Sequence, residues 1–235
     1  MSSRYIVGAY WPSRQESLDE CSDRLGIFLR QLEGCDPIFG SWRERGRSRR
    51  EALEQRIDAN DQARLHELLE RGRNRRDVGR EIIDELGFNV GMWSASGDRD
   101  VGLSIQCGLY WKSENQNTSL CNSVTLTLPK TLGGLGRAEK MAEILSIVAA
   151  AWEPAWAGVM SRDAMNTRDF DARRPFVDWM TYIPSRISEV PAPSTVQQLP
   201  GQGSIVVVQP MPPSGGEPQE LARIWQIDQL VQKAA

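Results

Sequence analysis

RYIVGAYW at residues 4–11 and PSRQESLDECSDRLGIFLRQLEG at residues 12–34 decide the fold of this chain. The first stretch carries apolar side chains at consecutive positions, so both faces of an extended segment are apolar, which predicts a strand. The second stretch has apolar residues at spacings of three and four, the period of one helix face: Leu18, Cys21, Leu25, Phe28, Leu29 and Leu32. We therefore predict a strand that is followed directly by an amphipathic helix.

The helix should begin soon after Pro12, which ends the strand. Ser13 and Glu16 have the Ser-x-x-Glu spacing of a capping box, so we expect Ser13 to cap the first turn. Gly34 is the expected end of the helix, because glycine readily adopts the left-handed conformation found after helix C-termini.

The chain beyond this unit is first charged and then strand-like. Residues 42–76 predict one or two exposed amphipathic helices, and a further helix is expected over residues 76–86. Three strand-like runs follow at residues 89–95, 101–112 and 118–128, joined by turns rich in Gly, Asp and Asn. In the third run apolar residues alternate with Thr125 and Thr127, so one face should be in water.

The second half predicts a helix over residues 135–152, an irregular charged loop over 161–175 and a proline-rich connection over 191–203. Strands are expected at residues 156–160, 179–183 and 204–209. A last helix over residues 217–231 should turn four residues inward: Leu221, Ile224, Trp225 and Val231. Because strands and helices come in groups, we expect an α+β fold with a largely antiparallel sheet packed against helices on one face. We expect a single domain over residues 1–235, with a charged helical insertion at about 42–76.

The bulk properties narrow the function classes. The net charge of −3 argues against a general nucleic-acid binder, which needs a basic face. The sequence has no apolar run long enough to span a bilayer and no secretory leader pattern, so we expect a cytoplasmic protein with no membrane partner. Cys21, Cys35, Cys107 and Cys121 should be reduced thiols, although a disulfide between the last two is conceivable.

The sequence offers little for catalysis. Its one histidine, His66, excludes most triads and zinc sites, and no nucleotide-binding or hydrolase motif occurs. Neighbouring carboxylates such as Asp19 with Glu20 are typical of a solvated surface. We therefore expect no enzyme, no cofactor and no metal.

Two features could instead serve binding. Arginines cluster at residues 43–50 and 71–76, which suggests as an alternative function a regulatory module that binds nucleic acid. The interspersed glutamates favour solvated ion pairs on helices instead. Among the eight tryptophans, Trp42 and Trp111 are the best candidates for anchors in a protein interface, unless they pack in the core.

The opening block, residues 5–42, resembles the start of the immunity protein 52 family of bacterial polymorphic toxin systems. The resemblance rests on a later Asp-Pro pair, on Trp42 and on eight earlier residues: Gly8, Tyr10, Trp11, Arg14, Glu16, Ser17, Cys21 and Arg24. A second match is the run DWMTYI at residues 178–183, with Trp179 and Tyr182, where Asp178 stands in place of the usual glycine.

This resemblance implies a non-catalytic α+β protein that binds a toxin with a restriction-endonuclease-like nuclease domain, often delivered by type VI secretion. It implies neutralisation in the cytoplasm, either by covering the active site of the nuclease or by changing its oligomeric state. We expect Arg14, Glu16 and Arg24 to form an internal charge network rather than a site. Whether the chain forms a homodimer stays open.

The toxin-binding surface is expected to be acidic, because a nuclease is basic where it meets DNA. The segment at residues 163–178, with Asp163, Asp169 and Asp171, is the candidate for that surface. No direct contact with nucleic acid is expected.

Overall fold

The computed structural model describes residues 4–45, 49–94, 97–110 and 120–235, which form two compact units. Unit 1 consists of residues 4–10 and 127–235, and unit 2 consists of the described residues between 11 and 126. Each unit has antiparallel strands and its own helices, so the expected α+β class is confirmed.

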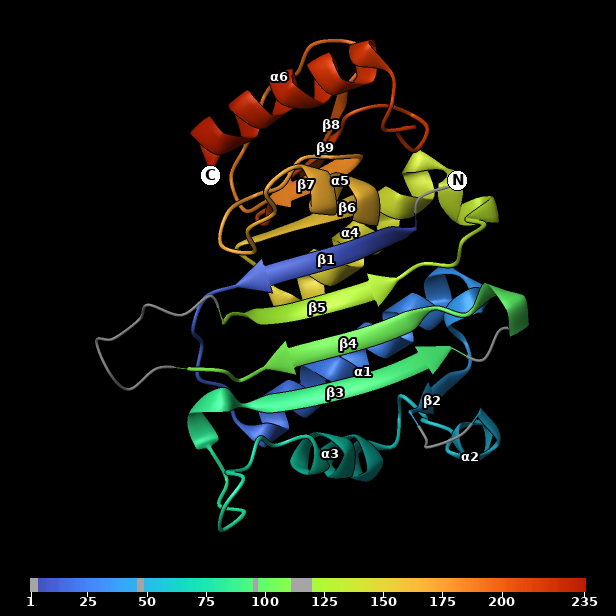
Figure 1. Cartoon of the computed structure of the whole chain (residues 1–235), viewed down its shortest axis with the longest axis vertical. Helices are drawn as coiled ribbons and strands as arrows, with labels where there is room; N and C mark the ends of the chain where they lie inside the picture. Colours follow the sequence, from blue (N-terminus) through green and yellow to red (C-terminus); the bar gives the residue numbers. More distant parts are fainter. Residues whose placement is uncertain (1–3, 46–48, 95–96, 111–119) are drawn as a thin grey trace. The chain divides into compact units, whose positions relative to one another are not determined.

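The strands of unit 1 pair in the order β1 (Tyr5–Trp11), β6 (Trp156–Ser161), β7 (Met180–Ile183), β9 (Gly203–Val207) and β8 (Thr195–Leu199), as Figure 1 shows. Every pairing is antiparallel, and Gly8 of β1 lies opposite Gly158 of β6. No residue of β1, β6 or β7 is exposed, so both faces of these strands are covered.

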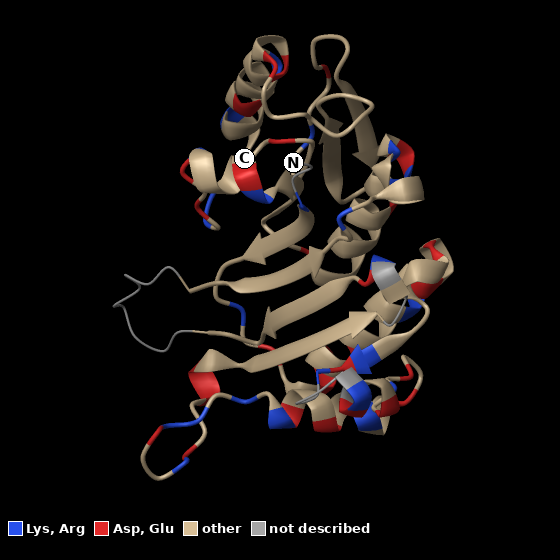
Figure 2. Cartoon of the chain, turned by 45° about the vertical axis from the view of Figure 1, so that its right-hand side comes forward, with Lys and Arg blue, Asp and Glu red and all other residues tan. Residues whose placement is uncertain are grey.

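Helices lie on both sides of these strands in unit 1. Helix α4 (Ala138–Trp152) packs on β6, β7 and β9, while α5 (Arg162–Thr167) lies on the other side (Figures 1 and 2). The last helix, α6 (Pro218–Ala234), buries Ile224, Ile227 and Val231.

Three expectations for unit 1 were wrong. The charged loop at 161–175 contains α5, because Ser161 caps a helical turn by accepting a hydrogen bond from the Ala164 N–H. The proline-rich connection contains the edge strand β8, whose mostly exposed, polar side chains hid its pairing with β9. On α6, Leu221 and Trp225 point outward, because the buried stripe follows the spacing of Ile224, Ile227 and Val231.

Unit 2 contains β2 (Trp42–Glu44), β3 (Phe88–Ser94), β4 (Gly102–Cys107) and β5 (Asn122–Thr127), with α1 (Leu18–Cys35) behind β3 and β4 in Figure 1. Burial alternates along β3, β4 and β5, so one face of this sheet is partly exposed. The expected wet side of Thr125 is confirmed.

Helix α3 (Gln62–Arg71) packs against α1, and α2 (Arg49–Glu54) follows β2, so the charged region at 42–76 includes a strand as well as helices. The expected helix at 76–86 was wrong. That stretch forms a bridge between Arg75 and Ile82 and a single 3-10 turn at Asp84–Leu86, and Val78 is 88% exposed.

The start of α1 also differs from the prediction. The capping box is formed by Ser17 and Glu20, four residues after the predicted pair, and the Ser17 N–H donates to the Glu20 carboxylate. The same Ser-x-x-Glu spacing occurs twice in succession, and Glu16 is not available because two arginines hold its carboxylate.

The four cysteines are free thiols, so the conceivable Cys107–Cys121 disulfide is absent. Cys107 instead lies beside Cys21, and this hydrogen-bonded contact together with burial raises the pKa of Cys107. Both thiols are fully buried.

Candidate functional site

Tyr10 of β1 links the opening block to the segment that follows α5. Its ring lies 4.8 Å from that of Trp156 on β6 and 5.6 Å from that of Phe170. Gly8 makes room for this arrangement, since a Cβ there would lie 2.7 Å from the Tyr10 hydroxyl oxygen. The ring of Tyr10 therefore holds the segment containing Phe170 against unit 1.

We call residues 168–178 the acidic segment. Phe170 also packs edge-on against Phe176 at 5.6 Å, and the Trp156 indole N–H donates to the Ala172 carbonyl at 2.8 Å. These contacts anchor the middle of the segment from one side.

Asp178 secures the end of the acidic segment. Its buried carboxylate accepts a hydrogen bond from the Ser161 N–H at 2.7 Å and lies 3.8 Å from the Arg168 guanidinium. Burial raises the pKa of Asp178 above its usual value. Arg168 also donates to the Val177 carbonyl and lies over the Phe176 ring. The aspartate that replaces the usual glycine of the family is thus a structural residue.

The predicted acidic residues lie at the surface but have arginine partners close by. Asp169 pairs with Arg174 at 3.1 Å, and Asp171 pairs with Arg173 at 2.8 Å. Hydrogen bonds from Arg173 lower the pKa of Asp171 to about 2. Asp163 lies apart from them, in the first turn of α5. The segment therefore displays mixed charge rather than a purely acidic face.

Helix α6 presents a large exposed aromatic residue that the sequence analysis placed in the core. The Trp225 side chain is 67% exposed. It borders a hollow of about 510 Å³. The hollow is lined by Glu189, Val190, Pro191, Trp225, Gln226, Gln229 and Leu230.

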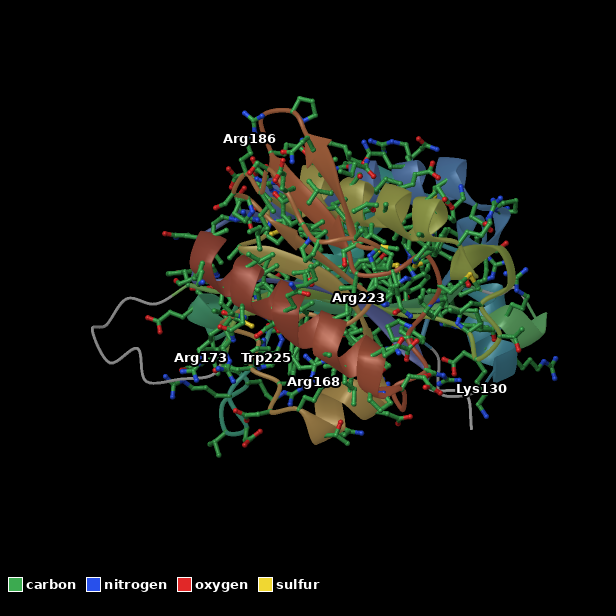
Figure 3. The ribbon with its side chains drawn as sticks, turned by 90° about the horizontal axis from the view of Figure 1, so that it is seen from above. Lys130, Arg168, Arg173, Arg186, Arg223 and Trp225 are labelled. Carbon is green, nitrogen blue, oxygen red and sulfur yellow. The ribbon has the colours of Figure 1, made fainter. Side chains whose placement is uncertain are left out.

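A second hollow of about 320 Å³ lies between α6 and the acidic segment. Its lining includes Asp169, Asp171, Asp228 and Gln229, and Gln229 also lines the first hollow. We call the two linings together the α6 surface. Figure 3 looks down on α6 and shows Trp225 together with Arg168 and Arg173. The α6 surface thus brings together two of the three predicted acids, while Asp163 does not line it.

The other predicted anchors contribute nothing to this surface. Trp42 is fully buried and its ring stacks on Phe39, so it cannot meet a partner as expected. Strand β2 carries it into the core of unit 2. Trp111 lies outside the described residues.

The remaining residues of the family pattern serve packing in both units. The Glu16 carboxylate forms ion pairs with Arg14 at 3.2 Å and with Arg24 at 2.8 Å, and its side chain is only 5% exposed. Arg14 also lies over the ring of Trp11. In unit 1 the Trp179 indole N–H donates to the Gln209 carbonyl, and the Tyr182 hydroxyl donates to the Gln202 carbonyl.

Several arginines of the two clusters form ion pairs within unit 2, namely Arg50, Arg71, Arg73 and Arg76. Arg71 lies 2.8 Å from Glu44, Arg76 lies 3.7 Å from Glu81, and Arg50 lies 4.0 Å from Glu54. Figure 2 shows basic and acidic residues interleaved along these helices. This pairing favours the solvated ion pairs over a phosphate-binding face.

The described part of the chain contains no group of three side chains suited to a metal ion. The Nε2 atom of His66 lies 2.9 Å from the Asp19 carboxylate at the surface of unit 2. No helix in the described ranges is long and apolar enough to cross a membrane.

The sequence analysis missed Trp225, Asp228 and Gln229 as surface residues. The available indication was the spacing of Ile224, Ile227 and Val231, which form one complete stripe on α6. Leu221 and Trp225 form a second stripe, four residues apart, that the inner face does not need.

Comparison with known proteins agrees with this picture. No curated protein matches the chain in sequence. Among solved structures, the chain is similar to the Pseudomonas aeruginosa T6SS protein PA0821, with a TM-score of 0.53 and 10% identity over 98% of this chain and 76% of that one. This likeness concerns the fold. The family model for immunity protein 52 matches residues 3–235, and the chain therefore belongs to the immunity protein 52 family.

Proposed function

We propose that this immunity protein binds a cognate secreted nuclease toxin in the cytoplasm of the producing cell and neutralises it without a reaction of its own. The observation that carries the proposal is the family match over nearly the whole chain. The contacts of the family-pattern residues support a binding role, because the structure uses Arg14, Glu16, Trp179 and Tyr182 for packing.

The α6 surface supports a nuclease as the partner. Its second hollow carries three carboxylates, from Asp169, Asp171 and Asp228. A nuclease must present basic side chains where it meets DNA phosphates, so negative groups on an inhibitor promote encounter and correct orientation. The arginine pairs of Asp169 and Asp171 reduce this charge, which makes a mixed polar contact with the toxin the better description.

Co-expression with the toxin encoded by the adjacent reading frame tests the function. We expect cells that make both proteins to survive with intact DNA, and we expect the two proteins to co-purify. Continued DNA degradation with no co-purification would refute the proposed function. Survival and co-purification with a toxin that degrades no nucleic acid would refute the nuclease assignment alone.

The contribution of the acidic segment is tested by charge reversal. Asp171→Lys should slow association with the toxin and reduce its dependence on salt, because long-range attraction acts mainly on the association rate. Glu54→Lys is the matched control, since Glu54 is also exposed and also lies near an arginine. An unchanged association rate for Asp171→Lys would place the binding surface elsewhere.

A further inference from the structure

We propose that the hollow beside Trp225 receives a long basic side chain, arginine or lysine, from the toxin. This inference rests on the proposed function and adds the place and chemistry of one central contact. It is built from three observations: the exposed indole of Trp225, the Glu189 carboxylate in the lining of the same hollow, and apolar residues in the rest of that lining.

Trp225 is exposed although α6 has a complete inner stripe without it. Ile224 and Ile227 are buried, whereas Trp225 is 67% exposed. An indole left in water at such a position contributes little to folding and is the side chain most enriched at energetic centres of protein interfaces. It also offers the most favourable aromatic face for a cation.

Glu189 supplies a negative charge to the lining of this hollow. It is exposed and lines the same hollow as Trp225. Within the described residues its carboxylate has no ion pair or hydrogen bond, in contrast to Asp169 and Asp171, which have arginine partners. An apolar or acidic guest would leave this carboxylate unpaired, while a basic guest would satisfy it.

The rest of the lining suits the stem of such a side chain. Val190, Pro191 and Leu230 give an apolar wall, and Gln226 and Gln229 add amide groups. Arginine and lysine bury their methylene stems against apolar surface while the charged end meets polar groups. A guanidinium stacked on Trp225 could therefore donate to Glu189.

The neighbouring hollow also favours a basic side chain from the partner. The Asp228 carboxylate accepts a hydrogen bond from the Gln232 amide and has no basic partner in the part of the chain that the structure describes. Glu189 and Asp228 thus leave two negative charges on the α6 surface without compensation. This charge balance selects a basic protein partner over a second copy of this acidic chain.

Binding kinetics with the purified, catalytically inactivated product of the adjacent toxin gene test the inference. Trp225→Ala should raise the Kd by at least about thirtyfold, mainly through faster dissociation. Val78→Ala is the matched control, because Val78 is an exposed apolar residue of unit 2, and it should change the Kd by less than about twofold.

Two further variants distinguish a basic guest from simple apolar contact. Glu189→Gln should weaken binding and flatten its salt dependence, and its effect should shrink in the Trp225→Ala background because both residues hold the same side chain. Gln229→Arg places a competing cation in the hollow and should also weaken binding. The Gln229→Arg variant keeps the test valid if Trp225→Ala lowers the melting temperature of the protein.

The outcomes are separable. If the wild-type chain binds the toxin but Trp225→Ala, Glu189→Gln and Gln229→Arg all keep the Kd within about threefold, the inference is wrong and the proposed function stands. If the wild-type chain does not bind the toxin, both are wrong. If the wild-type chain is a dimer in solution that Trp225→Ala dissociates, a second copy occupies the hollow and the inference is overturned.

Discussion

The strands of the two units differ in how many of their faces are covered. In unit 1 every residue of β1, β6 and β7 is buried, whereas burial alternates along β3, β4 and β5 of unit 2. The sequences already differ in this way, since YIVGAYW is apolar throughout while NSVTLT alternates. A sheet that is apolar on both sides needs a second covering layer.

That second layer in unit 1 includes α5 and the acidic segment, and the acidic segment lines the α6 surface with α6. The acidic segment therefore has two roles. Its inner side covers the strands of unit 1, and its outer side belongs to the candidate binding surface. Unit 2 has no equivalent requirement on the partly exposed face of its strands. This comparison predicts where substitutions should be costly, and four experiments test it.

The largest effect is expected for Trp179→Ala in unit 1. Trp179 is fully buried, contacts Tyr5 edge-on and donates to the Gln209 carbonyl. Its removal should lower the free energy of unfolding by about 3–5 kcal/mol, measured by urea denaturation. Trp93→Ala, on the partly exposed side of β3, should lose clearly less. Equal losses would contradict the difference between the strands of the two units.

Glu16→Gln should have the next largest effect, this time in unit 2. The substitution removes the charge that holds Arg14 and Arg24. We expect a loss of about 2 kcal/mol in the free energy of unfolding, because the arginines stay partly hydrated and the pair is not fully buried. Glu54→Gln removes an exposed partner of Arg50 and should change stability by less than about 0.5 kcal/mol. Similar losses for both would show that burial of Glu16 is unimportant.

The same substitution in a strand of each unit gives a sharper test. Thr181 of β7 is fully buried and its hydroxyl donates to the Phe176 carbonyl, so Thr181→Val should cost about 1 kcal/mol. Thr125→Val changes a partly exposed position of β5 and should stay within about 0.5 kcal/mol. Thermal unfolding of the two variants under the same conditions provides the measurement. A larger loss for Thr125→Val would reverse the comparison.

The smallest effect is a dependence on pH at Asp178. Burial raises the pKa of this carboxyl in the folded protein, so its protonated form is favoured there. Its contribution to stability is complete below the pKa of the unfolded chain and is lost as the pH rises through the folded pKa. Over a measured range from about pH 4 upward, the wild type should therefore lose stability relative to Asp178→Asn. A constant difference across this range would contradict the raised pKa.

Much of the fold could be predicted because its core elements are strongly periodic. The spacing of Leu25, Phe28 and Leu32 identifies α1, and the apolar run of β1 identifies a strand covered on both sides. Two elements were missed because their pattern is weak. Strand β8 is exposed at most positions, and α5 depends on a cap rather than on an apolar stripe.

The candidate site was predictable only in part. Asp169 and Asp171 are visible in the sequence as surface charges, but the arginine partners that reduce their charge depend on the turn that brings Arg173 and Arg174 back to them. Of the two places expected for Trp42, the structure shows the core, whereas Trp225 is exposed, because tryptophan is suited both to a core and to an interface. The composition alone could not decide which tryptophan is buried in the core and which is exposed at the surface.

Phe170 has a consequence for how the specificity of such a protein can change. It is the one residue between Asp169 and Asp171, and its ring fixes the loop against Tyr10 and Trp156. Position 171 can therefore vary without disturbing that anchor. Position 169 tolerates fewer residue types, because its φ of 32° favours Asp, Asn or Gly. Retargeting to a new toxin would thus change position 171 before position 169, while the aromatic anchor stays constant.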